Sequence, residues 1–229
     1  MIYDILATGS SGNAIVINGE ILIDCGVPMK KLRESGYIKS LKLVLLTHSH
    51  GDHFNPATVR ALHQDRPKLR FGCCEWMVPH LREAGVSKLS IDVARPTEPG
   101  ESSRALIYNN FAIVDPVHLV HDVPNCGWMI HKNHERLLYA TDTSSLDHIK
   151  AKGYDLYFIE ANHTQAEIEA RIAEKQSRGE FAYEVRAART HLSQERALDW
   201  LARNAGPNSQ YVFLHQHKDK EAHDELDTP

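Results

Sequence analysis

Short apolar runs separated by turn residues make up the first part of the chain. They predict strands over Ile2–Ala7, Ala14–Ile17 and Glu20–Cys25, and Asn18-Gly19 is typical of a hairpin turn between the last two. The continuous apolar run Leu41–Leu46 is typical of a buried strand. This part of the chain is therefore predicted to be rich in antiparallel strands.

Helical spacing and further strands alternate along the rest of the chain, with Ser193 suited to cap a helix. Two strand-rich halves with helices between the strands predict an α/β fold of two sheets packed face to face under outer helices. The helices are predicted over Pro28–Ser35, Pro56–Asp65, Glu75–Ala84, Gln165–Arg189 with a break near Gly179, and Ser193–Asn204. The further strands are predicted over Leu69–Cys73, Leu106–Tyr108, Phe111–Val114, Trp128–His131, Leu137–Ala140, Leu156–Glu160 and Tyr211–Leu214.

Composition narrows the class of protein. The chain has 229 residues, 42% hydrophobic and 24% charged, which excludes collagen, a coiled coil and wholesale disorder. We expect one domain over residues 1–217 and a polar tail over 218–229, with the polar stretch 95–103 as a connector at most. No signal-peptide pattern or membrane-length apolar run is visible, so we expect a cytoplasmic protein with reduced cysteines and no membrane partner. The net charge of −4 argues against a dedicated duplex-DNA binder.

Fifteen histidines stand out in the composition, and spacing singles out one cluster. Residues Thr47–His53 read THSHGDH and directly follow the apolar run Leu41–Leu46. In a loop at a strand end, successive side chains can turn inward, and imidazole with carboxylate suits Zn²⁺ or a similar divalent ion. A histidine-rich surface loop is the alternative. Four candidate ligands in six residues are too many for one open catalytic site, so we expect two metal ions.

The THSHGDH segment resembles the signature of the metallo-β-lactamase superfamily. Within it, the chain is similar to the small WalJ/YycJ-like metallohydrolases and nucleases, which are related to tRNase Z-type phosphodiesterases. The resemblance runs from Met1 to about His217 and implies a four-layer αββα sandwich of two mixed sheets with outer helices. Its further motifs, in the order of that branch, are ATGSSGNA (7–14), LIDCG (22–26), HD (121–122), CGW (126–128), ATDT (140–143), IEANH (159–163), HLS (191–193) and LH (214–215).

The resemblance also implies a set of metal ligands. One ion would be held by His48, His50 and His121, the other by Asp52, His53 and His215, with Asp142 bridging both. Asp142 and His215 each follow a predicted strand, where a site between two sheets would collect ligands. His118 and His217 stay open as alternatives to His121 and His215, with a supporting role otherwise. Zn²⁺, Mn²⁺ and Fe²⁺ are all compatible with such ligands.

Two bridged ions would lower the pKa of a shared water enough to give hydroxide near neutral pH, and Asp52 could orient or deprotonate that water. The similarity to tRNase Z enzymes implies that Glu160 and His191 assist protonation of the leaving group. His163 is a further candidate, for ligand support or substrate contact. The alternative for both His191 and His163 is a helix-capping or surface-exposed histidine without a catalytic role. Asp24, a carboxylate in an apolar strand, is expected to support the ligands by hydrogen bonds rather than to face water.

These features predict a binuclear-metal-dependent phosphodiesterase whose substrate is a nucleic acid or a nucleotide, because two-metal sites suit in-line displacement at phosphorus. The rival enzyme is a small-molecule hydrolase: a thioesterase, a lactonase or a cyclic phosphodiesterase. A metal-binding module without turnover is the rival from another class. The charged stretch Gln165–Arg189 has two interpretations. It is either a solvent-exposed helix face or a nucleic-acid track, that is, a line of side chains that bind the phosphate backbone, formed by Arg178, Arg186 and Arg189. The oligomeric state stays open, with a homodimer among the alternatives.

Overall fold

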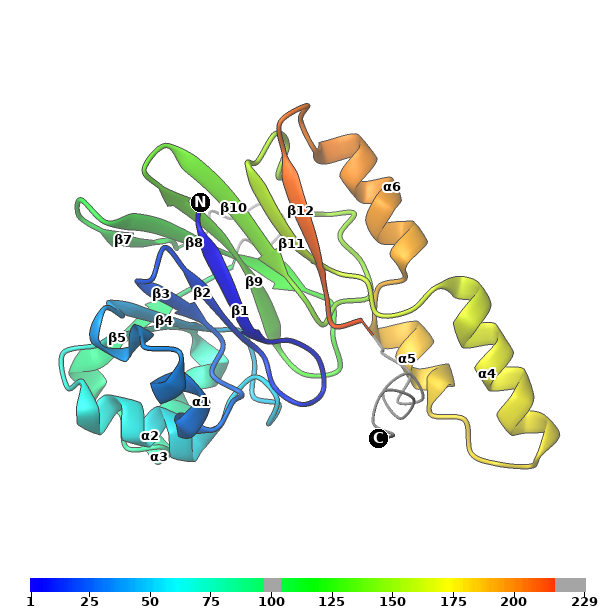
Figure 1. Cartoon of the computed structure of the whole chain (residues 1–229), viewed down its shortest axis with the longest axis horizontal. Helices are drawn as coiled ribbons and strands as arrows, with labels where there is room; N and C mark the ends of the chain where they lie inside the picture. Colours follow the sequence, from blue (N-terminus) through cyan, green and yellow to red (C-terminus); the bar gives the residue numbers. More distant parts are fainter. Residues whose placement is uncertain (97–103, 217–229) are drawn as a thin grey trace, which may run out of the picture.

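The chain folds into a four-layer αββα sandwich, as expected from the sequence (Figure 1). The computed structural model describes residues 1–96 and 104–216, so the predicted tail and His217 lie outside the described residues. The first six-stranded sheet contains, in spatial order, β1 (Tyr3–Ala7), β2 (Ala14–Ile17), β3 (Ile21–Ile23), β4 (Leu43–Leu46), β5 (Arg70–Cys74) and β6 (Ile91–Ala94). Its strands β1 to β3 are antiparallel, whereas β3 to β6 are parallel.

The second sheet repeats this mixed arrangement. Its six strands, in spatial order, are β12 (Gln210–Leu214), β11 (Leu156–Glu160), β10 (Glu135–Ala140), β9 (Asn125–Lys132), β8 (Ala112–Leu119) and β7 (Leu106–Tyr108). Strands β7 to β10 are antiparallel, and β10, β11 and β12 are parallel. Each sheet therefore has a parallel part whose strands end at the same edge.

Helices cover the outer faces of the two sheets. In Figure 1, α1 to α3 lie against the first sheet, α6 lies along β11 and β12, and α4 and α5 project beside the second sheet. The helices are α1 (Met29–Glu34), α2 (Pro56–Asp65), α3 (Val78–Glu83), α4 (Gln165–Ser177), α5 (Glu184–Thr190) and α6 (Gln194–Asn204), with 3₁₀ turns at Tyr37–Lys39, Glu75–Met77 and Lys88–Ser90. Among these helices, none is long and apolar enough to cross a membrane.

Three apolar layers hold the sandwich together. Ile15 and Trp128 belong to the central layer between the sheets, whereas Val16 packs in the layer under α1 to α3. Trp200 of α6 packs in a third layer against Tyr157 of the second sheet. Because both faces of the inner strands are buried, their sequences are continuous apolar runs rather than alternating ones.

Several local signals define the helices as the sequence predicts. The Asn55 side chain accepts hydrogen bonds from the first backbone amides of α2, and Ser193 caps α6. The predicted long helix is two helices, and Gly179 lies between them with a φ of 68°. The predicted helix over Glu75–Ala84 starts as a 3₁₀ turn before it becomes α3.

Three strands differ from the prediction by more than two residues at an end. Strand β9 begins at Asn125 rather than at Trp128. The sequence analysis missed β6, because IDVA mixes polar and apolar residues and is too short to show a period. Strand β8 runs to Leu119 rather than ending at Val114, although it contains Pro116. Proline is accommodated there because β7 pairs only as far as Val114, so Pro116 pairs with β9 alone.

Candidate metal centre

Strands of both sheets bring polar side chains together at their carboxyl ends. His48 and His50 follow β4, Asp142 follows β10 by two residues, Glu160 is the last residue of β11, and His215 follows β12. Because β10, β11 and β12 are parallel, their last residues lie at one edge of the second sheet. The side chains that the sequence spreads over most of the chain thus meet at one end of the sandwich.

Three residues at these strand ends have a left-handed backbone. The φ angle is 58° at Asp24, 57° at Asp142 and 53° at His215. Such angles are uncommon outside glycine, and Asp, Asn and His are enriched among the exceptions. A left-handed residue ends the alternation of its strand, so its side chain is no longer confined to one face of the sheet. Backbone strain at these positions is typical of a functional site.

The first histidine group is the one that the resemblance assigns to one metal ion. Candidate ligand atoms of His48, His50 and His121 all lie within 4.8 Å of one another, and His121 Nε2 is 3.4 Å from His50 Nδ1. Burial and the nearby charge of His53 lower the pKa of His48 to about 2, so its imidazole is neutral. Among the described residues, no hydrogen-bond partner lies at the buried atoms His48 Nε2 and His121 Nδ1. These nitrogens fit a bound cation.

A second group surrounds Asp142. His215 Nδ1 lies 3.0 Å from Asp142 Oδ1 and 3.4 Å from Glu160 Oε1. His191 Nδ1 donates a 2.5 Å hydrogen bond to Glu160 Oε1 and lies 3.9 Å from Asp142 Oδ1. Burial lowers the pKa of His215, but the carboxylates of Asp142 and Glu160 outweigh it and raise that pKa to about 10. Glu160 therefore lies between a candidate metal ligand and the candidate proton donor.

His53 connects the two sheets through a buried network. Its Nδ1 donates a 2.7 Å hydrogen bond to Asp24 Oδ2, and its Nε2 lies 3.0 Å from Asp142 Oδ2. Asp24 also accepts hydrogen bonds from the backbone and hydroxyl groups of Thr47. Burial lowers the pKa of His53, but the two carboxylates outweigh it and raise that pKa well above its usual value. Asp24 is fully buried and hydrogen-bonded, rather than facing water.

Asp52 lies at the edge of a cleft that opens onto these groups. The cleft has a volume of about 300 Å³, and its lining includes Asp52, His50, His121, Asp142, His191 and His215. Asp52 Oδ2 is 3.7 Å from His53 Nε2. The set that the resemblance assigns to the second ion, Asp52, His53 and His215, is not gathered as tightly as the first, because the rings of His53 and His215 are 6.4 Å apart with Asp142 between them.

The remaining predicted residues lie farther from these groups. His118 is exposed, and its ring neighbours His148 at 6.4 Å, so His121 rather than His118 joins His48 and His50. His163 is buried beside Asn162, to which its Nδ1 donates a 3.3 Å hydrogen bond, and it is not in any of the candidate ligand groups among the described residues. His217 lies outside the described residues.

A comparison with protein families agrees with this geometry. The family model of the β-lactamase superfamily domain matches residues 20–216. The chain belongs to the metallo-β-lactamase superfamily. Members of this superfamily are metal-dependent hydrolases, and the histidine and aspartate clusters described above are a candidate metal site of that kind. A search of curated proteins finds no significant match to the sequence.

Solved structures with the metallo-β-lactamase fold resemble the chain over nearly its whole length. Human tRNase Z, short form, aligns with a TM-score of 0.72 and 15% identity over 95% of this chain and 93% of that one. Zinc-bound PqqB from Methylobacterium extorquens aligns with a TM-score of 0.67 and 13% identity, over 94% of this chain and 89% of that one. YhfI from Bacillus subtilis, a metallo-β-lactamase fold protein, aligns with a TM-score of 0.66 and 16% identity, over 93% of this chain and 85% of that one. At these identities the likeness concerns the fold.

Sequence reasoning missed several residues that contact the metallo-β-lactamase site. Asn13, in the predicted loop before β2, places its side-chain nitrogen 2.8 Å from His53 Nε2. Tyr139 of β10 donates a 3.0 Å hydrogen bond to Asp24. Asp122 Oδ1 lies 3.1 Å from His121 Nε2 and 3.6 Å from His50 Nε2. Asp122 directly follows a candidate ligand, which was a usable signal, whereas nothing in the sequence points to Tyr139.

Proposed function

We propose that this metallo-β-lactamase-fold protein is a phosphodiesterase with two divalent metal ions, acting on a nucleic acid or a nucleotide. The observation that carries the proposal is the hydrogen-bonded pair of His191 and Glu160, at 2.5 Å. His191 Nδ1 lies 3.9 Å from Asp142 Oδ1, and Glu160 Oε1 lies 3.4 Å from His215 Nδ1. A simple metal-binding module has no need for a proton donor beside its ligands. The substrate class also takes support from the tRNase Z neighbour, whose name denotes a nuclease of tRNA.

The proposed ligands follow the groups in the structure. His48, His50 and His121 would hold one ion, and Asp142, which lies between His53 and His215, would be shared with a second ion near Asp52. When bound, two such ions supply Lewis acidity and activate water at neutral pH. Zn²⁺ and Mn²⁺ are both consistent with imidazole and carboxylate ligands, and Fe²⁺ is a third alternative.

The chain's own residues perform the proton chemistry in this proposal. Glu160 accepts the hydrogen bond from His191 Nδ1 and is itself held by the backbone amides of Thr143 and Leu192. Burial lowers the pKa of His191, but Glu160 and Asp142 outweigh it and raise that pKa, which favours the protonated imidazole. Because Nδ1 is hydrogen-bonded to Glu160, the proton available for transfer is the one on Nε2, and His191, which lines the cleft, is positioned to give it to a leaving oxygen. Asp52, at the same cleft, orients the attacking water.

A small-molecule hydrolase is the second candidate function. Thioesterases, lactonases and cyclic phosphodiesterases would use the same ligands but depend little on Glu160 and His191. The cleft of about 300 Å³ is large enough for a small ester as well as for one nucleotide unit of a longer chain. Placement in the WalJ/YycJ-like branch and a cytoplasmic location belong to the proposal, and the oligomeric state stays open.

The test is hydrolysis of bis(p-nitrophenyl) phosphate by protein loaded with Mn²⁺ or Zn²⁺. We expect metal-dependent release of nitrophenolate that is abolished in Asp52→Ala, with bound metal measured by elemental analysis in both proteins. Exposed His118 provides the matched control, because His118→Ala should retain both metal and turnover. Fully metal-loaded protein without any turnover of the diester would contradict the proposal, and hydrolysis of a thioester or lactone in its place would establish the second candidate.

A further inference from the structure

One face of the helix α5 lines the candidate cleft. Its lining residues Tyr183, Arg186, Ala187, Thr190 and His191 are spaced three, four, seven and eight positions from the first, which is one stripe of a helix. The stripe combines an aromatic ring, a guanidinium and a hydroxyl, and it ends at the candidate proton donor His191. A molecule that reaches His191 therefore lies along this face of α5.

Arg186 is the one arginine or lysine among the described residues that line the cleft. The carboxylates of Asp52, Asp122 and Asp142 also line the cleft, together with four histidines. The Nη2 atom of Arg186 contacts Asp122, whose other carboxylate oxygen lies 3.1 Å from His121 Nε2. A guanidinium has five N–H donors, so this contact leaves donors for an anion, and the Arg186 side chain is 72% exposed. Asp122 thus holds a permanent cation at the mouth of the cleft.

Tyr183 lies one helical turn before Arg186 on the same face and is 49% exposed. The ammonium of Lys175 lies 4.0 Å from the centre of its ring and itself pairs with buried Glu184, so the position of the ring is defined by α4. Proteins that bind single-stranded nucleic acids combine an exposed aromatic ring with a nearby cation. A base stacks on the ring, and the cation binds the phosphate backbone.

We propose that the α5 face is a nucleotide-binding strip, in which Arg186 binds the phosphate next to the reacting diester and Tyr183 stacks on the adjoining base. The substrate is then a single-stranded nucleic acid rather than an isolated small ester. This inference rests on the proposed phosphodiesterase function and adds the class of nucleic acid and the residues that select it.

The experiment compares two substrates of the metal-loaded enzyme. Bis(p-nitrophenyl) phosphate has one phosphate and no base, whereas a labelled oligonucleotide of about eight thymidines offers the full strip. In Arg186→Ala and Tyr183→Leu, kcat/KM should fall at least about tenfold more for the oligonucleotide than for the small diester, mainly through KM. Fluorescence anisotropy should show weaker oligonucleotide binding, and Arg186→Ala should reduce the log–log salt slope by about one.

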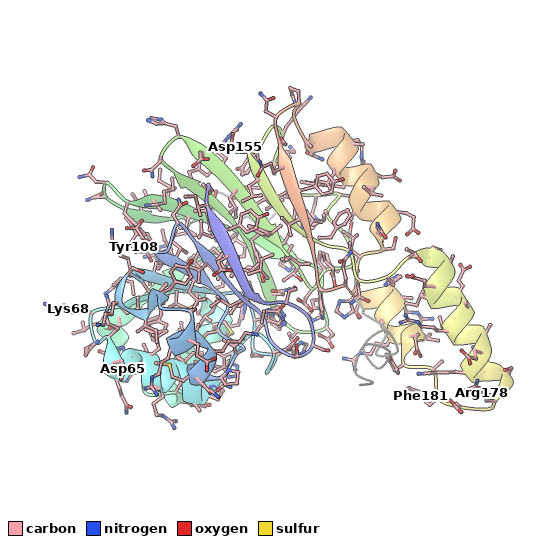
Figure 2. The ribbon with its side chains drawn as sticks, viewed as in Figure 1. Asp65, Lys68, Tyr108, Asp155, Arg178 and Phe181 are labelled. Carbon is pink, nitrogen blue, oxygen red and sulfur yellow. The ribbon has the colours of Figure 1, made fainter. Side chains whose placement is uncertain are left out.

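Matched controls are Arg178, at the end of α4, and Tyr211, near the start of β12. Of the three arginines in the predicted nucleic-acid track, all within the described residues, Arg186 lines the cleft whereas Arg178 and Arg189 do not. Figure 2 shows Arg178 and Phe181 at the outer tip of the projecting helices, and Arg178→Ala also breaks an ion pair, with Glu174. Tyr211 of β12 is 51% exposed, close to the value for Tyr183, and does not line the cleft. Arg178→Ala and Tyr211→Leu should leave both activities and the salt slope unchanged.

Three outcomes would overturn the inference. They are equal losses on both substrates in Arg186→Ala, no loss on either, or the same loss in the Arg178 control. Metal content and the thermal midpoint are measured for each variant, because Asp122 also contacts His121. If Arg186→Ala does not fold, Arg186→Lys should fold and show an intermediate loss, since lysine keeps the charge without the planar donors. A metal-loaded wild type that hydrolyses neither substrate would instead contradict the proposed function, and the anisotropy would still report on the strip.

Discussion

Gly26 is the position where the loop that bears the candidate ligands comes closest to another part of the backbone. A Cβ atom built on Gly26 would lie 1.7 Å from the carbonyl oxygen of Asp52 and 2.7 Å from the backbone nitrogen of His53. Ordinary van der Waals contact begins at 3.4 Å, so the Gly26→Ala variant cannot form without a shift of the Thr47–His53 loop.

The size of the effect follows from the hydrogen bonds at this crossing. Asn13 donates to the carbonyl of Asp52 at 2.6 Å, Cys25 donates to that of His53 at 2.9 Å, and Gly26 donates to that of Asn13 at 3.0 Å. A backbone hydrogen bond contributes roughly 1 kcal/mol net, so losing these three lowers the free energy of unfolding by about 3 kcal/mol. The same shift moves His48 and Asp52 relative to Asp142, so metal affinity should fall as well.

Denaturant unfolding of the metal-stripped protein measures the stability term, and elemental analysis of the loaded protein measures bound metal. Gly51→Ala is the control, because Gly51 lies in the same loop, has no atom within 4 Å of its built Cβ and is not left-handed. We expect Gly51→Ala to resemble the wild type in both measurements. A Gly26→Ala protein with wild-type stability and full metal content would refute the reasoning from close approach.

Three further predictions concern single side chains. His48→Ala should lower the bound metal, measured by elemental analysis, whereas exposed His118→Ala should not; unchanged stoichiometry in the first would rule His48 out as a ligand. His191→Ala should lose more activity on a diester with a poor leaving group than on p-nitrophenyl esters, and equal losses would indicate a role in binding instead. The pKa of Glu20 is lowered by its hydrogen bond to Lys42, so its carboxylate stabilises the fold above pH 4.5 and loses this effect as the pH falls through the lowered value. Glu20→Gln should therefore flatten the acid side of a plot of unfolding free energy against pH, and an unaltered acid slope would contradict the assignment.

The sequence predicted most strands because buried apolar runs and turn residues are local signals. Strand β11, Leu156–Glu160, matches the prediction at both ends, since an apolar run meets polar residues on either side. Strand β8 continues past its predicted end at Val114 although proline disfavours a strand, and the short partner β7 makes Pro116 acceptable. Whether a neighbouring strand reaches a given residue is a property of the assembled sheet, which one sequence does not contain.

In the candidate site, too, some groupings could be predicted from the sequence and others could not. The group of His48, His50 and His121 was predictable, because two of its members are two positions apart in a dense motif and the third follows from the resemblance. The contact between Tyr139 and Asp24 was not, since the two residues are 115 positions apart and tyrosine in a strand is ordinarily a core residue. The resemblance predicted Asp142 as a bridging ligand, but its close approach to His53 and His215 became visible only when both sheets were in place.

The left-handed backbone at Asp24, Asp142 and His215 affects how alanine substitutions at these positions are interpreted. Alanine at these positions removes a polar group. It also leaves a residue with a Cβ atom, and no polar side chain to form local hydrogen bonds, in a left-handed conformation that costs about 1–2 kcal/mol. Asparagine tolerates this backbone, so at Asp24 and Asp142 it removes only the charge and at His215 it removes only the imidazole. An alanine scan will therefore overstate the chemistry of these three residues relative to His48, which is not left-handed, and asparagine substitutions will rank them correctly.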